Sequence, residues 1–175
     1  MNKGAYWVRV FLKSIAMAIA GLLASILTFG NNNLSGKVVS VIDGNTVEVM
    51  TTENDTVRII FHGIDCPEID QDYGEKARRH LEKMILEKNV TIDIQGKDRW
   101  GNRLAIILIN GEIDPRLEML EQGLAWTAER NPISELESLR EKAEEKNKGL
   151  WREQNPTPPW VFRRQQTMMQ PKSSS

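Results

Sequence analysis

Residues 40–49, SVIDGNTVEV, are typical of a β-strand, a tight turn and a second β-strand. Asp43-Gly44-Asn45 is a strong turn signal. Residues 46–50 alternate in character, which places Val47 and Val49 on one face of a strand. Further strand patterns at residues 37–42 and 57–62 flank this stretch, the second after another turn at 53–55. The spacing predicts a three-stranded antiparallel meander.

The rest of the chain alternates between helical and strand patterns. A helix is predicted over 74–87, since Ala77, Leu81, Met84 and Ile85 fall on one helical face. Strands follow at 90–94 and 104–109, then helices at 115–121 and 133–148 that stop at Gly123 and Gly149. Past Arg164 we expect an extended or mobile tail. This order predicts an α+β protein, a five-stranded Greek-key barrel with about three helices.

The amino-acid composition excludes several kinds of site and constrains how the chain could bind nucleic acid. One cysteine, Cys66, excludes an internal disulfide framework and a multi-cysteine zinc site. The chain has 23 Lys and Arg against 24 Asp and Glu, and three of the basic groups but none of the acidic ones lie in residues 1–35. The remainder therefore has a net negative charge, which repels phosphate at long range. Contact with nucleic acid then requires a local basic patch or a bound cation.

The N-terminus has the layout of an export segment. Residues 15–29 carry no charge, and Lys3, Arg9 and Lys13 precede them. An uncleaved membrane anchor over residues 8–29 is favoured over a cleaved signal peptide. Either way the body is exported, to the outer side of the inner membrane or, after cleavage, to the periplasm or medium. The expected organisation is 1–35 signal or anchor, 36–152 barrel domain and 153–175 Pro-containing tail.

Several motifs occur in a characteristic order. They are SVIDGNTVEV at 40–49, FHGIDCPE at 61–68, DYGEKA at 72–77, KDRWGNRLA at 97–105, GLAW at 123–126, GLW at 149–151 and PPWVFRR at 158–164. Together they resemble the thermonuclease, or staphylococcal-nuclease-like, family over about residues 36–164. The resemblance implies an OB-fold barrel of five strands with three helices, and a calcium-dependent endonuclease that hydrolyses the phosphodiesters of DNA or RNA.

The resemblance also implies roles for individual residues. Glu68 matches the glutamate that orients or deprotonates the attacking water, and Asp65 matches a calcium carboxylate. Cys66 falls where a backbone carbonyl helps to hold calcium, while Asp43 matches an acid that acts on the ion through water. In such a site the cation polarises a phosphate oxygen, and two arginines match the charge that develops on the phosphate.

Three positions depart from the family pattern. Asn45 replaces the second calcium carboxylate, so affinity for Ca²⁺ should fall. Ile60 and Asn102 replace the two phosphate-binding arginines. Arg58 lies on the same strand face as Ile60, and Arg103 flanks Asn102, so both are candidate replacements. We do not favour full replacement of the lost arginines by Arg58 and Arg103, because a phosphate-binding group must lie within about 0.5 Å of its productive position.

Other residues have two possible interpretations, one functional and one structural. Arg99 and Trp100 are candidate substrate contacts, Trp100 by stacking on a base, although packing is favoured. Asp43-Gly44-Asn45 could be a hairpin turn alone, and Asp65 and Glu68 could be loop acids.

Three functions therefore stay open. The first is an exported, calcium-dependent nuclease with an incomplete site and weak activity. The second is a domain that has lost catalysis and binds nucleic acid, a nucleotide or a protein partner. The third, a membrane-tethered scaffold, has little support beyond composition.

Overall fold

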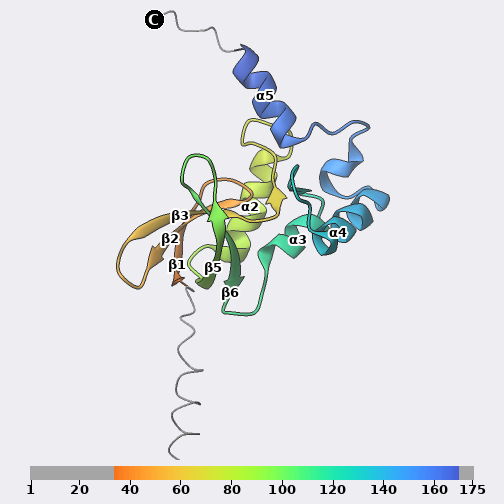
Figure 1. Cartoon of the computed structure of the whole chain (residues 1–175). Helices are drawn as coiled ribbons and strands as arrows, with labels where there is room; N and C mark the ends of the chain where they lie inside the picture. Colours follow the sequence, from red (N-terminus) through yellow and green to blue (C-terminus); the bar gives the residue numbers. More distant parts are fainter. Residues whose placement is uncertain (1–33, 170–175) are drawn as a thin grey trace, which may run out of the picture. The chain divides into compact units, whose positions relative to one another are not determined.

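The computed structural model describes residues 34–169, and a closed five-stranded barrel lies at its centre (Figure 1). The barrel strands are β1 (Leu34–Val41), β2 (Thr46–Thr51), β3 (Thr56–Phe61), β5 (Asn89–Lys97) and β6 (Arg103–Ile109). The helices are α2 (Gly74–Ile85), α3 (Pro115–Glu121), α4 (Ser134–Glu145) and α5 (Pro159–Met169), with a 3-10 turn η1 (Gly149–Arg152). The predicted barrel fold is confirmed.

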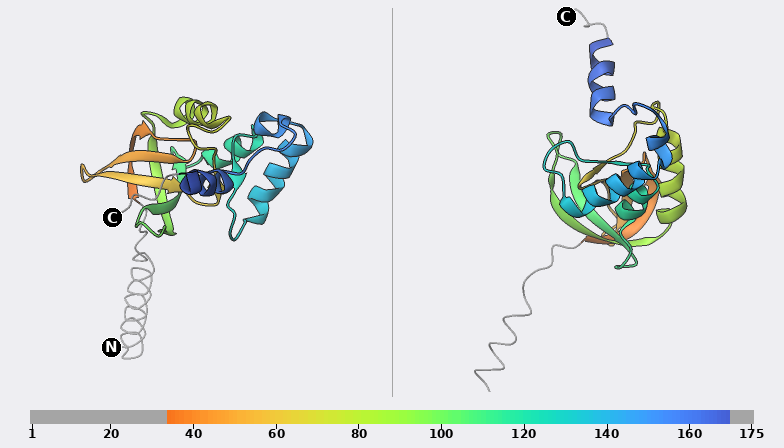
Figure 2. Two further views of the ribbon diagram at one scale, coloured as in Figure 1. Left: turned by 90° about the horizontal axis from the view of Figure 1, so that it is seen from above. Right: turned by 90° about the vertical axis from the view of Figure 1, so that its right-hand side faces the viewer.

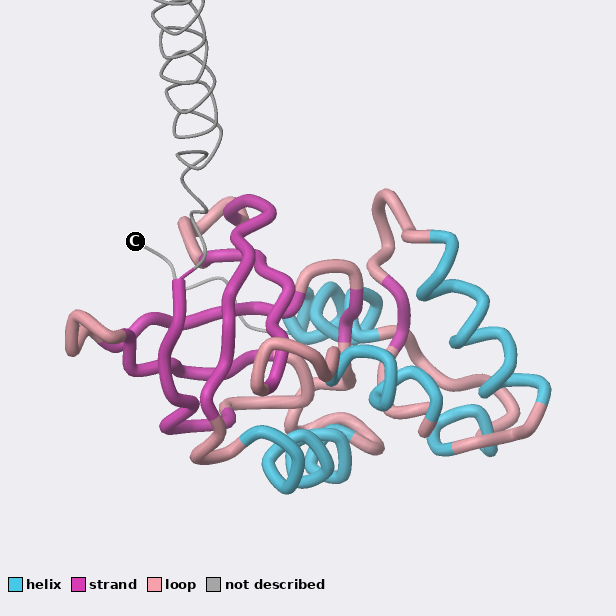
Figure 3. The backbone as a smooth tube through the Cα atoms, turned by 90° about the horizontal axis from the view of Figure 1, so that it is seen from below, coloured by secondary structure: helices cyan, strands magenta, loops and turns pink. Residues whose placement is uncertain are grey.

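Barrel closure depends on pairings between strands that are distant in sequence. β1, β2 and β3 form the predicted antiparallel meander, with Val38 opposite Val49 and Val47 opposite Ile59. β6 runs parallel to β3 and antiparallel to β5, and β5 pairs with β1 to close the barrel. Figure 3 shows the strands wrapped around one another, with helices to the side and below.

Apolar side chains from the strands and from α2 form one continuous core. Val47, Val49, Ile59 and Phe61 are fully or almost fully buried inside the barrel. In α2 the buried face is Gly74, Ala77, Leu81 and Ile85, close to the face predicted from the helical spacing, and Met84 packs at its edge. Figure 2 shows α2 alongside the barrel and α3 and α4 together beyond it.

The structure differs from the predicted elements in three places. A two-stranded sheet joins β4 (Ile64–Asp65) to β7 (Trp126–Thr127), and strands this short leave no alternation in the sequence. The helix predicted at 133–148 is α4, which ends at Glu145, and η1 follows it. The tail expected to be extended past Arg164 is instead helical to Met169, because Pro159 suits a helix N-terminus and nothing in 160–169 breaks the helix.

The export segment predicted at residues 1–35 lies almost wholly outside the described residues. None of the helices within residues 34–169 is both long and apolar enough to cross a membrane.

Candidate functional site

The two central acids of the predicted site lie on a short segment that packing holds in place. Asp65 pairs with Trp126 across the β4–β7 sheet, and Pro67, which separates it from Glu68, is buried. Glu68 is held through its backbone, whose carbonyl accepts the Gln71 N–H at 2.9 Å. Gly74, at the start of α2, packs directly onto that carbonyl, and a Cβ there would come within 1.7 Å of the oxygen. The loop thereby sets where the Glu68 side chain begins.

A single guanidinium joins the two carboxylates. Arg163, on α5, donates from Nη1 to Asp65 Oδ1 at 3.0 Å and from Nη2 to Asp65 Oδ2 at 2.6 Å. Nη1 also donates to Glu68 Oε1 at 2.6 Å. The Asp65 contact is a two-pronged fork, the strongest form of carboxylate–arginine pairing. Arg163 therefore supplies the positive charge beside these two carboxylates.

The Asp43-Gly44-Asn45 turn packs against the same segment. Asp43 Oδ1 accepts the Asn45 backbone N–H at 2.8 Å, as in a simple Asx turn. The side-chain oxygen of Asn45 accepts the backbone N–H of Cys66 at 2.9 Å, and both residues are buried. A Cβ on Gly44 would lie 2.6 Å from that of Cys66, so only glycine allows this close approach. The turn thus fixes the position of the chain just after Asp65.

The pKa shifts show that Asp43, Asp65 and Glu68 share one electrostatic environment. Burial raises the pKa of Asp65, and the charge of Asp43 adds to the rise, while the hydrogen bonds and charge of Arg163 oppose it. Burial raises the pKa of the Cys66 thiol well above its usual range, with contributions from all three acids. The hydrogen bonds from Arg163 to Asp65 raise the pKa of the arginine. Asp43 therefore acts electrostatically on the same segment that carries Asp65 and Glu68.

Ile60, which the resemblance assigns to the first arginine position, is half-buried on β3, opposite Thr46. The candidate replacement Arg58 lies opposite Glu48 on β2, and its Nη2 is 3.2 Å from Glu48 Oε1. The structure thus pairs Arg58 with a carboxylate on the neighbouring strand, and the guanidinium at Asp65 and Glu68 comes from α5.

Asn102, which the resemblance assigns to the second arginine position, lies in the β5–β6 loop. Asn102 donates from its backbone N–H and its side-chain Nδ2 to the two carboxylate oxygens of Asp98, at 2.9 and 2.8 Å. Arg99 lies over the ring of Trp100, 3.9 Å from its centroid, and Trp100 is 72% exposed. Arg103 is half-buried at the start of β6. Asn102 therefore stabilises the loop that presents the exposed Arg99–Trp100 pair.

The residues do not fit a calcium site in this arrangement. Both Asp65 oxygens and one Glu68 oxygen accept hydrogen bonds from Arg163, and the Asn45 oxygen accepts one from Cys66. Calcium takes six to eight oxygen ligands. Within residues 34–169, no group of three or more His, Cys, Asp or Glu side chains is arranged to hold a metal ion. The chemistry of the donors suits a hard cation, but a guanidinium already engages them.

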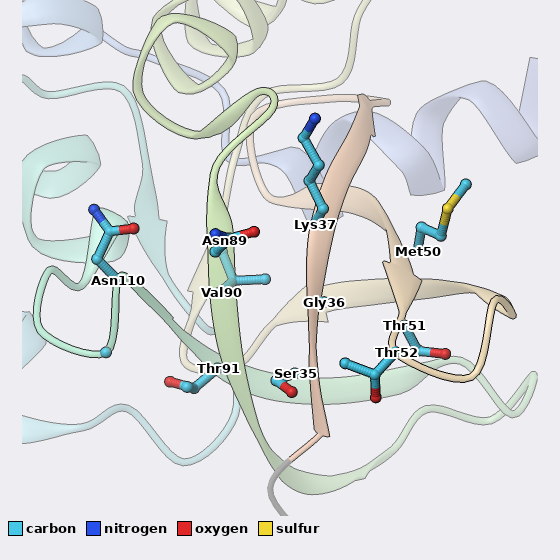
Figure 4. A pocket seen from close by; sticks show the side chains of 11 residues that line it. Ser35, Gly36, Lys37, Met50, Thr51, Thr52, Asn89, Val90, Thr91 and Asn110 are labelled. Atoms are coloured by element: carbon cyan, nitrogen blue, oxygen red, sulfur yellow. The ribbon is translucent and has the colours of Figure 1, made fainter.

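A separate pocket of about 520 Å³ lies on the barrel wall between β1, β2 and β5 (Figure 4). Its lining includes Ser35, Lys37, Thr51 and Thr91 and none of the predicted site residues. Lys37, its charged group, pairs with Glu87.

Arg163 is a site residue for which the sequence predicted no role. Its signal was the segment PPWVFRR, where a proline-started helix brings two adjacent arginines after Trp160. Trp160 packs edge-on against Trp126, with ring centroids 5.7 Å apart, and Trp126 is paired with Asp65. Arg163 follows Trp160 by three residues on the same helix face, which carries it to Asp65.

Comparison with known proteins identifies the relatives of this chain. The family model "Staphylococcal nuclease homologue" matches residues 58–153. An "Uncharacterized endonuclease" of Escherichia coli O157:H7 is 34% identical over 132 residues, which cover 75% of this chain and 86% of the relative. "Protein ParB" of Escherichia coli is 32% identical over 167 residues, 87% of this chain and 94% of the relative. "Micrococcal nuclease" of Shigella flexneri is 26% identical over 164 residues, 87% and 92% of the two chains. With its closed barrel and its Asp65–Glu68 loop, the chain belongs to the staphylococcal nuclease homologue family.

Proposed function

We propose that this chain is a slow nuclease that hydrolyses phosphodiester bonds in DNA or RNA, with Glu68 as the general base. The observation that carries the proposal is that Asp65 and Glu68 lie close enough to bind one guanidinium, in a member of a nuclease family. A base at this position can take a proton from water as the water attacks phosphorus. Relatives of this chain are named as endonucleases and as a micrococcal nuclease.

Slow turnover follows from the side chains that replace the family arginines. Removing one donor to a developing oxyanion typically costs about 3–4 kcal/mol, a factor of 10²–10³ in rate. Ile60 offers no such donor, and the amide of Asn102 is bonded to Asp98. Cleavage should therefore be measurable only at high enzyme concentration and long times.

Calcium dependence and export belong to the same proposal. We infer that calcium is needed, and that it binds in a state in which Arg163 has left Asp65 and Glu68, since the donors do not fit the ion otherwise. The charge layout of residues 1–29 supports export, with the segment kept as an anchor or cleaved.

A second candidate function is a domain that binds nucleic acid or another partner without cleaving it. The observation that favours it is the number of catalytic positions already engaged within the protein: Asn45 with Cys66, Asn102 with Asp98, and both carboxylates with Arg163.

One experiment separates the two functions. Full-length chain, kept in mild detergent because residues 15–29 are apolar, is incubated in excess with labelled DNA or RNA, in calcium or in chelator. Glu68→Gln is compared with Glu112→Gln, a matched change at an exposed acid between β6 and α3. We expect slow calcium-dependent cleavage that Glu68→Gln abolishes and Glu112→Gln retains. Binding without cleavage, unchanged by either variant, would establish the second function.

A further inference from the structure

α5 contacts Asp65 and Glu68 through Arg163, whose guanidinium binds the two carboxylates as a cation would. Arg163 places one positive charge against Asp65 and Glu68 through three hydrogen bonds of 2.6–3.0 Å. The charges of Asp43 and Glu129 also act on Asp65, and Glu129 is paired with Arg164, so four acids stand against two guanidinium groups. This leaves net negative charge, which continues to attract cations.

The helix that carries Arg163 is attached in a way that allows release. Within α5 only Pro159 is buried, residues 160–162 are half-buried, and residues 163–169 are exposed. Besides Arg163, Trp160 packs edge-on against Trp126, and Arg164 forms an ion pair with Glu129. The Arg163 side chain is 46% exposed, so solvent screens its pairing. Such a helix can undock without unfolding the barrel, because it contributes little to the core.

α5 also lies outside residues 58–153, the part matched by the family model. The guanidinium at Asp65 and Glu68 is therefore supplied from beyond the matched region, while Ile60 stands at the family's own arginine position on β3.

We propose that Arg163 is an internal cation that takes the place of the divalent ion, so that docking of α5 and binding of calcium at Asp65 and Glu68 exclude each other. The inference rests on the proposed function, because it concerns the same site. The exclusion is chemical: the Asp65 oxygens that accept the two prongs of Arg163 would have to turn to the metal, and a divalent ion beside the guanidinium would be repelled. Docked α5 thus blocks calcium from Asp65 and Glu68, and calcium binds there only when α5 undocks.

The test measures calcium binding directly. Calcium alone is titrated by equilibrium dialysis into the full-length chain in mild detergent and into Arg163→Ala and Arg164→Ala. Both variants remove one positive charge from adjacent positions of α5, so Arg164→Ala controls for net charge. We expect Arg163→Ala to bind calcium about tenfold more tightly than the unaltered chain, equivalent to ~1.4 kcal/mol, since the competing state is removed. Arg164→Ala should stay within about twofold, as expected for a surface pair.

A second readout follows α5 itself. In the unaltered chain, saturating calcium should speed amide hydrogen exchange across residues 159–169, because the helix has left its partners. Equal calcium affinity of the two variants, no calcium binding by Arg163→Ala, or unchanged protection of α5 at saturation would each overturn the inference. Loss of cleavage by Arg163→Ala at unchanged calcium affinity would also overturn it, and would make Arg163 a contact to the substrate phosphate. Tighter calcium binding by Arg163→Ala without cleavage of DNA or RNA would remove the proposed function and support this inference.

Discussion

Asn45→Ala tests whether the side chain of Asn45 stabilises the fold in the absence of a metal ion. The structure gives its oxygen one clear partner, the backbone N–H of Cys66 at 2.9 Å. Asn45 is 8% exposed and Cys66 2% exposed, so an orphaned N–H would be poorly reached by water. The backbone bonds of Asn45 would survive, since its N–H donates to Asp43 and its carbonyl accepts from Phe61.

The expected loss follows from that single bond. A buried donor without a partner costs about 1–3 kcal/mol, and we take ~2 kcal/mol for Asn45→Ala. For a chain of this size the loss lowers Tm by about 4–8 °C. Urea unfolding of the full-length chain in chelator gives the free energy of unfolding, with the m-value checked for constancy. Chelator is essential, because it removes any contribution from a metal.

Asn45→Asp is the matched variant. A carboxylate oxygen can accept the same N–H, so the Cys66 amide should stay protected from hydrogen exchange, whatever the added charge does to overall stability. In Asn45→Ala that amide should exchange much faster. A loss below about 0.5 kcal/mol in chelator, together with unchanged protection of Cys66, would refute the structural role of Asn45.

Three further predictions concern the loop, the pH response and the exposed tryptophan. Gly74→Ala should cost about 2–4 kcal/mol in thermal or urea unfolding, because its Cβ meets the Glu68 carbonyl at 1.7 Å, whereas Gly96→Ala, with nothing within 4 Å, should stay within about 0.5 kcal/mol. Equal losses would contradict the close packing of Gly74. Side-chain hydrogen bonds from Arg78 and Arg79 lower the pKa of Glu75 from 4.5 to about 2. The folded-state pKa of Glu75 lies below the unfolded value, so its ion pairs stabilise the folded chain above about pH 4.5. The difference in unfolding free energy between the unaltered chain and Glu75→Gln should therefore vanish as pH falls toward 2. A difference between the two proteins that is constant with pH would argue against this pairing. Trp100→Ala should leave stability within about 0.5 kcal/mol, since the side chain is 72% exposed. It should weaken single-stranded DNA binding by about 1–3 kcal/mol in a fluorescence titration if a base stacks there, and unchanged affinity would leave Trp100 without that role.

Local sequence patterns predicted the barrel strands and the first helices closely. The helix expected at residues 115–121 matches α3, with the Asp114 side chain accepting the Arg116 N–H at its start. The predicted meander of β1–β3 is present because turn residues and alternation are signals within a few residues of one another. The two-residue strands β4 and β7 were missed, since strands this short show no period and are fixed by their partner alone.

Local motifs and strand patterns were enough to indicate the family and the succession of barrel strands along the chain, because neighbouring residues carry these signals. The partners of Asp65 and Glu68 became known from the packing of the folded chain. Arg58 lies two residues from Ile60 and pairs with Glu48, whereas Arg163 lies 98 residues from Asp65 and forms a fork with it. The partner of a charge depends on the packing of distant elements, here Trp160 of α5 against Trp126 of β7, and no local spacing carries that information.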